Sequence, residues 1–192
     1  MTKLILAACL ALWLQPALGG PPLICQSFET GGAKSLPWKH TGGWLGADPQ
    51  YDVSRLTEDT LAILTPEASL PLRMETMRRA SIYAARTEGM AAAIAARLHS
   101  RALNSEAAGK PDPLAWFDAG YWVESVRQAA FIYRYDMLSS DEKAAWRIRS
   151  GLDGMDGYRW VQKAVDLGGR GMERALSLME GYRKADLAAS GR

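Results

Sequence analysis

The chain has 192 residues, with 23 lysines and arginines against 21 acidic residues and a formal net charge of +2. Charges of both signs are interspersed at this near balance, which excludes the concentrated basic patch of proteins that bind nucleic acid or an anionic membrane. A chain of this length suits one domain that buries roughly 70% of the surface of its unfolded form, so packing alone can stabilise it.

Residues 1–19 have the three parts of an export signal. Lys3 supplies the positive charge, residues 4–14 form an apolar run, and residues 17–19 (Ala-Leu-Gly) make a small-x-small cleavage site. The apolar run is shorter than the roughly 20 residues that span a bilayer. We therefore expect cleavage near Gly19 and a periplasmic or secreted protein that is not attached to a membrane.

Residues 20–52 are predicted to form an irregular arm, because their prolines and glycines interrupt any helical or strand period. The arm carries four aromatic residues, whereas disordered tails are poor in aromatics. We expect these rings to anchor the arm on the rest of the protein: Phe28, Trp38, Trp44 and Tyr51.

The stretch FETGGAKSLPW, residues 28–38, has some likeness to a phosphate-binding loop. A Walker loop requires Gly-x4-Gly-Lys-Ser/Thr, but Ala33 precedes Lys34 and Phe28 stands in place of the first glycine. The two adjacent glycines, residues 31–32, instead predict a tight turn with positive φ.

Cys25 is the single cysteine left after removal of the signal, which excludes an internal disulfide. Four roles are open: a small buried apolar residue, an intermolecular disulfide that links a homodimer, a catalytic thiol, or a metal ligand. A thiol nucleophile needs a histidine, and the two in the chain are His40 and His99. No pattern typical of cysteine hydrolases surrounds Cys25.

Neither a metal nor a cofactor is expected. The two histidines and Cys25 offer no ligand pair at short spacing. The loop at residues 153–157 resembles the start of a calcium loop but lacks its third oxygen ligand and its terminal glutamate. We predict an ordinary connection between helices there.

From residue 53 to residue 192 the apolar pattern is helical and no strand is predicted, so we expect an all-α domain of six to seven helices. The expected helices cover residues 54–64, 70–86, 90–108, 113–138, a segment opened by Ser139 or Ser140, 158–167 and 171–187. The helix at 113–138 is apolar on more than one side, which predicts a buried central element. Asp112 is its expected N-cap, and Gly109 ends the preceding helix.

Three segments, 70–108, 113–150 and 155–188, each have the length of a helical hairpin. Trp116 and Gly120 have the Trp-x3-Gly spacing of tetratricopeptide units, which this part of the chain resembles. Val123 stands where that family has tyrosine. The resemblance implies stacked hairpins, with an irregular helical bundle as the alternative. The chain is also similar to an exported bacterial family, a likeness that implies no activity.

Glu124-Ser125 resembles the Glu-Ser pair of lytic transglycosylases, which implies that Glu124 acts as general acid and base of an envelope glycosidase. That role requires a cleft and a raised pKa. The later Gly-Leu-Met-Gln segment of that family is absent. Arg127 lies three residues further on, a spacing that predicts an ordinary helical ion pair.

The favoured prediction is a non-catalytic exported protein that binds a peptide or protein partner, or acts as a scaffold in the envelope. The arginines along residues 70–108 are expected on a solvated face that lines a groove for an acidic peptide. The candidate binding residues are Trp38, Trp44, Arg78 and Arg79. The alternative is an envelope enzyme, either a glycosidase using Glu124 or a thiol enzyme using Cys25 with His40 or His99.

Overall fold

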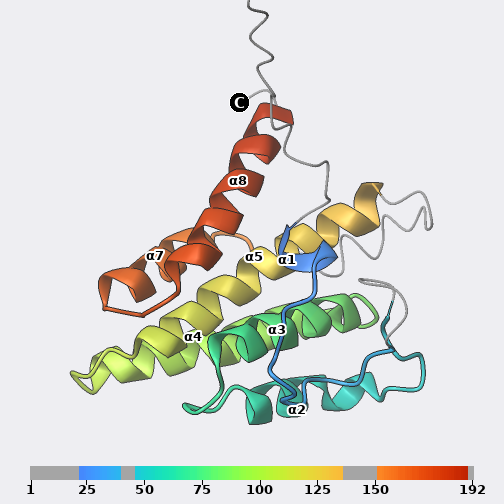
Figure 1. Cartoon of the computed structure of the whole chain (residues 1–192), viewed down its shortest axis with the longest axis horizontal. Coiled ribbons are helices and arrows are strands. Elements are labelled where there is room, and N and C mark those ends of the chain that lie inside the picture. Colours follow the sequence, from blue (N-terminus) through green and yellow to red (C-terminus); the bar gives the residue numbers. More distant parts are fainter. Residues whose placement is uncertain (1–21, 40–45, 136–150, 190–192) are drawn as a thin grey trace, which may run out of the picture.

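A computed structural model describes residues 22–39, 46–135 and 151–189, and the fold within these residues is all-α (Figure 1). The helices are α1 (Pro22–Cys25), η2 (Val53–Arg55, a 3-10 turn), α2 (Leu56–Ile63), α3 (Leu70–Ala84), α4 (Met90–Ala107), α5 (Pro113–Tyr135), α7 (Gly157–Asp166) and α8 (Glu173–Ala189). The described part contains no strand, only an isolated antiparallel bridge between Trp38 and Ala47. None of its helices is long and apolar enough to cross a membrane. The predicted signal and the helix expected to begin at Ser139 or Ser140 lie outside the described residues.

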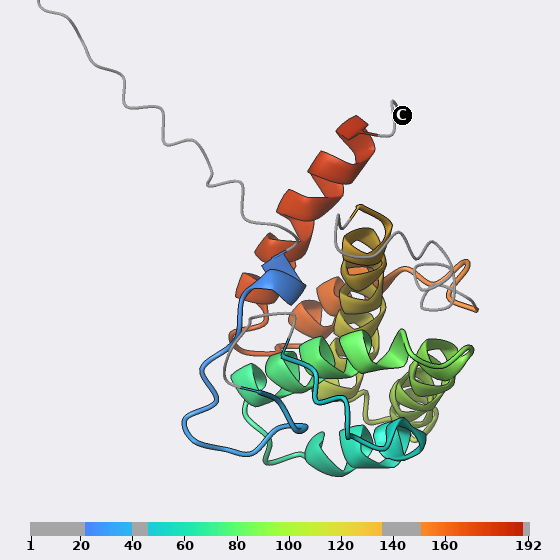
Figure 2. The same cartoon turned by 90° about the vertical axis from the view of Figure 1, so that its right-hand side faces the viewer.

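Helix α5 is the centre of the fold, as its apolar pattern predicted. It packs against α1, α3, α4 and α7, and Figures 1 and 2 show it running through the middle of the molecule. The described buried side chains of α5 lie on more than one side of the helix, as expected: Trp116, Phe117, Ala119, Tyr121, Trp122, Val123, Val126, Ala129 and Ala130. Neighbours in sequence also pack, with α2 on α3, α4 on α5 and α7 on α8, while α3 and α4 make few contacts with each other.

Local signals set the ends of α3, α4 and α5. Ser69 caps α3 by accepting a hydrogen bond from the N–H of Leu72. Gly109 follows the end of α4 with φ of +68°, a conformation in which glycine carries no steric penalty. Asp112 accepts a hydrogen bond of 2.9 Å from the N–H of Leu114 at the start of α5. These three boundaries follow from residues within a few positions along the chain.

Helices α5 and α7 cross at two glycines. A Cβ on Gly120 would lie 2.5 Å from the carbonyl oxygen of Gly157 and 2.7 Å from the backbone nitrogen of Val161. A Cβ on Gly157 would lie 2.5 Å from the carbonyl oxygen of Gly120. The glycine of the Trp-x3-Gly pattern therefore permits backbone contact between α5 and α7.

The arm begins with a short helix that the sequence did not predict. Leu23 and Ile24 of α1 are fully buried, and α1 packs on α5, α8 and α3. The N–H of Leu23 donates a hydrogen bond of 2.8 Å to Gln128 on α5. Burial of these two side chains, rather than local helix propensity, holds this single turn in place.

The rest of the described arm lies along α3 (Figure 2). Gly31 and Gly32 have φ of +65° and +85°, so the predicted turn is confirmed. Beyond the turn, Leu36 is buried, and the carbonyl of Pro37 accepts a hydrogen bond from Tyr83. The rings of Phe28, Trp38 and Tyr51 pack partly buried against the core, while Trp44 lies outside the described residues.

Candidate functional site

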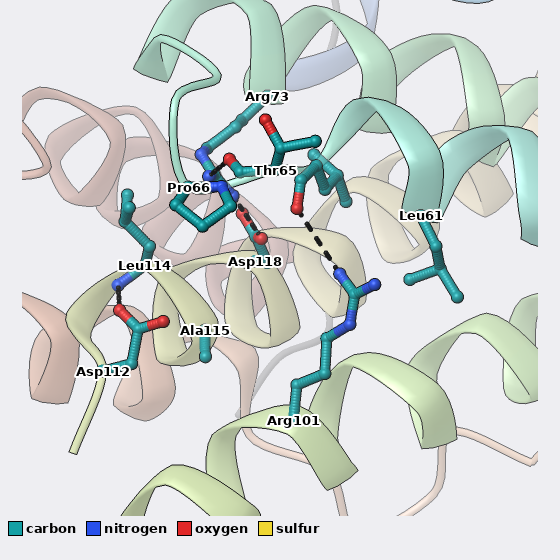
Figure 3. Close-up of a pocket in the computed structure, with 10 residues that line it drawn as sticks. Leu61, Thr65, Pro66, Arg73, Arg101, Asp112, Leu114, Ala115 and Asp118 are labelled. Atoms are coloured by element: carbon teal, nitrogen blue, oxygen red, sulfur yellow. Dashed lines mark hydrogen bonds and ion pairs between the residues drawn. The ribbon is translucent and has the colours of Figure 1, made fainter. Parts of the chain in front are cut away.

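A cavity of about 370 Å³ lies where the end of α2 and the α2–α3 connection meet α3, α4 and α5 (Figure 3). Apolar residues and four charged residues line it: Leu61, Leu64, Thr65, Pro66, Arg73, Arg101, Asp112, Leu114, Ala115 and Asp118. Its volume falls within the range of about 300–1,000 Å³ found for small-molecule and cofactor pockets. Each wall comes from a different element, so the cavity exists only in the folded chain.

Asp118 and Arg73 form a buried ion pair in the wall of this cavity. Nη1 of Arg73 lies 2.5 Å from Oδ2 of Asp118, and the two side chains are 1% and 6% exposed. Arg73 also donates to the carbonyl oxygens of Ala68, at 3.1 Å, and Thr65. The guanidinium thus fastens the α2–α3 connection to α5. The other carboxyl oxygen of Asp118, Oδ1, is buried without a hydrogen-bond partner.

Burial raises the pKa of Asp118 to about 7, because desolvation of the ionised carboxylate outweighs the attraction of Arg73 and, more weakly, of Arg101. The negative charge of Asp112 acts in the same direction as burial. A carboxyl group in a cavity with a pKa near neutrality is a recognised mark of a functional site. Asp118 combines a pKa near neutrality with a buried carboxyl oxygen that has no hydrogen-bond partner.

The two remaining charged residues of the cavity are exposed. Arg101 on α4 donates one hydrogen bond, of 3.5 Å, to the carbonyl oxygen of Leu64, and Figure 3 shows its guanidinium directed toward that connection. Asp112 uses Oδ1 to cap α5 at Leu114. Both side chains are accessible from solvent, in contrast to the buried pair of Arg73 and Asp118.

Replacing Asp118 with asparagine is expected to flatten the dependence of stability on pH. The unfolded chain releases this proton near pH 3.8 and the folded chain near pH 7, so the free energy of unfolding falls as pH rises between these values, by up to about 1.4 kcal/mol per pH unit. The D118N variant keeps two other contributions, because burial raises the pKa of Glu124, which gives a slope of the same sign, and lowers the pKa of His99, which gives a slope of the opposite sign. Thermal unfolding of D118N between pH 4 and pH 8 checks this, with exposed Asp153→Asn as control. Equal slopes in D118N and the parent would contradict it.

A second charged cluster joins the arm to α3. Glu75 is 1% exposed and accepts hydrogen bonds from Arg78, from Arg79 and from the N–H of Phe28. Burial alone would raise the pKa of Glu75, but these hydrogen bonds and the charge of Arg78 outweigh it and hold the pKa below its usual value. The guanidinium carbons of both arginines lie over the Trp38 ring, 4.9 and 5.7 Å from its centroid.

The prediction that these arginines lie on a solvated face is therefore wrong for Arg73 and Arg78, which are buried. Arg78 is fully buried against the carbonyl of Ile24 and against Glu75, so it has no surface to offer a peptide. The side chain of Arg79 keeps 21% exposure and donates to the carbonyl of Leu36. Carbonyl groups of the arm accept hydrogen bonds from Arg78 and Arg79. Arg73 forms its buried ion pair with Asp118.

The thiol candidates are not brought together within the described residues. Burial raises the pKa of Cys25 in spite of the nearby charge of Arg78, which disfavours the thiolate that a nucleophile needs. His99 is stacked on Trp160 with ring centroids 4.1 Å apart, and no hydrogen bond links it to Cys25. His40 lies outside the described residues.

Glu124 lies on α5 against the start of α7. It is buried, forms the predicted ion pair with Arg127, and lies so close to α7 that a Cβ on Gly157 would be 2.8 Å from its Oε1. Burial raises its pKa against the opposing effect of Arg127, as a general acid requires. Glu124 is not among the residues that line the cavity described above.

Among the described residues, no group of three or more histidine, cysteine, aspartate or glutamate side chains could hold a metal ion. Comparison with protein families, curated proteins and solved structures finds no match. The functional assignment therefore depends on the cavity and its side chains.

Sequence reasoning missed Asp118 as a site residue and placed Arg73 and Arg101 only among the arginines of an expected solvated face. One signal could have found Asp118, which stands between Phe117 and Ala119 in a helix that is apolar on more than one side. A charged residue in such a helix must be paired or unusually protonated. Nothing in the sequence distinguishes Arg73 and Arg101 from the other arginines of α3 and α4.

Proposed function

We propose that the protein is an exported, non-catalytic binding protein, and that the cavity between α2, α3, α4 and α5 receives part of a peptide or protein partner. The observation that carries this proposal is a cavity with a buried, unsatisfied carboxyl oxygen beside an exposed guanidinium. The export signal expected at residues 1–19 is the basis for the proposed periplasmic or secreted location.

The lining of the cavity favours binding over catalysis. It contains no cysteine, histidine or serine, and its most perturbed acid, Asp118, is held by Arg73. Its size is near the lower end of the usual range, which suits one side chain or a chain end. Stacked helical hairpins of tetratricopeptide kind would present such a site between neighbouring helices, but α3 and α4, the two helices of the first expected hairpin, make few contacts with each other.

Retention of peptides by the immobilised protein tests the proposal. From a pool of random synthetic octapeptides with free ends, we expect the protein to retain a reproducible subset. Arg101→Glu, which reverses an exposed charge at the cavity, is expected to lose that subset. Arg97→Glu is the matched control, since Arg97 is also exposed, lies four residues earlier on α4 and does not line the cavity.

Two outcomes would contradict the proposal. One is retention no greater than that of the heat-unfolded protein. The other is equal loss in R97E and R101E, which would indicate nonspecific attraction between peptides and a basic surface. A homodimer linked through Cys25 stays a separate prediction, and its side chain is partly exposed.

A further inference from the structure

The charges of the cavity are arranged on two sides. Arg101 projects from α4, whereas Asp112 immediately precedes α5 and Asp118 lies within it, with Ala115 between them in the sequence (Figure 3). The charges are close enough to affect one another, because Arg101 and Asp112 shift the protonation of Asp118 in opposite directions. A ligand that fills this space therefore meets a cation on one side and carboxyl groups on the other.

Arg101 is suited to a carboxylate. A guanidinium carries five N–H donors in a planar fork, which matches a carboxylate in bidentate geometry. The single hydrogen bond of Arg101 within the described residues, to Leu64, is 3.5 Å long, so most of its donors are available. Arg73 is not available in this way, because its donors are taken by Asp118, Thr65 and Ala68.

The side formed by α5 is suited to an N–H donor. Oδ1 of Asp118 has no partner, and Asp112 uses only Oδ1 in capping α5. Less than 1 Å² of the Asp118 oxygen is exposed, so a ligand reaches it only if a neighbouring side chain moves. Arg101 can move most readily among the wall residues, because it is exposed and is held by one long hydrogen bond. A buried acceptor without a hydrogen bond destabilises the folded chain, and a ligand N–H donor would remove that penalty.

Apart from Thr65, the remainder of the lining is apolar: Leu61, Leu64, Pro66, Leu114 and Ala115. We propose that the cavity binds an apolar α-amino-acid unit with a free carboxylate, whether the carboxyl-terminal residue of a peptide or a free amino acid. The carboxylate pairs with Arg101, the N–H faces Asp112 and Asp118, and the side chain contacts the apolar lining. This ligand class rests on the proposed binding function.

Calorimetric titration with four probes tests the proposal: the tripeptide Gly-Gly-Leu, its carboxyl-terminal amide, free leucine and free glycine. We expect Gly-Gly-Leu to bind with a Kd near 1 mM or tighter, as for a small ligand of average efficiency. The amide should bind at least about tenfold more weakly, because it cannot form the charged pair with Arg101. Free glycine should not bind, since it lacks the apolar side chain.

Variants assign the effect to the cavity. R101E should weaken the binding of Gly-Gly-Leu at least about tenfold and remove the difference in affinity between the acid and its amide. R97E should bind Gly-Gly-Leu as the parent does and should keep that difference. Free leucine that binds as tightly as Gly-Gly-Leu would assign the site to amino acids, and weaker binding of leucine would assign it to peptide ends. Both results support the proposal.

Two results would overturn it. Equal affinity of Gly-Gly-Leu and its amide would exclude the carboxylate contact and leave the binding function intact. Failure of both Gly-Gly-Leu and leucine to bind, while the octapeptide pool is still retained by the parent and lost by R101E, would show that the ligand class is wrong. If the parent protein retains no octapeptides from the pool, that separate result contradicts the proposed binding function.

Discussion

Glu75→Gln is expected to lower the free energy of unfolding by about 3–5 kcal/mol and to release the arm from α3. The substitution removes one partner of a buried charge cluster and leaves the buried guanidinium of Arg78 uncompensated. The N–H of Phe28 also loses a charged acceptor. Urea unfolding gives the free energy, and hydrogen exchange of residues 27–39 measures release of the arm.

Two variants make the test of Glu75 specific. Glu88→Gln is the matched control, since Glu88 is exposed in the α3–α4 connection and its loss should change stability by less than about 0.5 kcal/mol. The double variant E75M/R78M removes both charges and should recover part of the loss. The proposed role of the cluster is wrong if E75Q and E88Q unfold at the same urea concentration.

The effect of E75Q should also depend on pH. Burial alone would raise the pKa of Glu75, but hydrogen bonds and charge from Arg78, the N–H of Phe28 and Arg79 hold it below its usual value. Its stabilising contribution is therefore present above the unfolded pKa and is lost as pH falls through the lower folded pKa. The difference in stability between E75Q and the parent should narrow in strong acid.

Gly120→Ala is expected to destabilise the fold by about 3 kcal/mol. The added methyl would lie 2.5 Å from the carbonyl oxygen of Gly157 and 2.7 Å from the backbone nitrogen of Val161, so α5 and α7 must separate. Backbone atoms cannot turn aside as a flexible side chain can. Urea unfolding measures the loss, and near-ultraviolet circular dichroism reports on the packing of Trp116 and Trp122, which are buried on the same helix.

Gly181→Ala is the control for this prediction. Gly181 lies within α8, and a Cβ there meets no atom within 4 Å. The substitution should raise stability by roughly 0.5–1 kcal/mol, because alanine is the better helix former. If G120A were as stable as G181A, the close crossing of α5 and α7 would be wrong.

The sequence predicted the helical elements well because their boundaries depend on nearby residues. The cap at Asp112, the stop at Gly109 and the turn at Gly31–Gly32 are each built from contacts between residues a few positions apart. The central position of α5 followed from apolar residues on more than one of its sides. The short helix α1 was missed, because its stability comes from α5, α3 and α8 and its own sequence contains proline.

The candidate site could not be predicted in the same way. Arg73 and Arg101 look like other arginines on helix surfaces until Asp118, 45 residues from Arg73, is brought beside them. Arg78 was expected in solvent, but the carbonyl of Ile24, 54 residues away, and the carboxylate of Glu75 draw it into the interior. The partner of Arg73 and the Ile24 carbonyl that accepts from Arg78 are both distant in sequence. Glu75 is only three residues from Arg78, but that spacing is common on exposed helix faces and does not mark an arginine as buried.

The sequence alone therefore determined the all-α class, the helix ends and the buried central helix, since periodicity and capping are properties of short segments. Tertiary structure decided which charges are buried and where the cavity lies. The cost of burying a guanidinium or a carboxyl is offset by partners that include groups from other elements, such as Arg73 for Asp118 and the Ile24 carbonyl of the arm for Arg78. The unsatisfied oxygen of Asp118 exists only because α2, α3, α4 and α5 close around it.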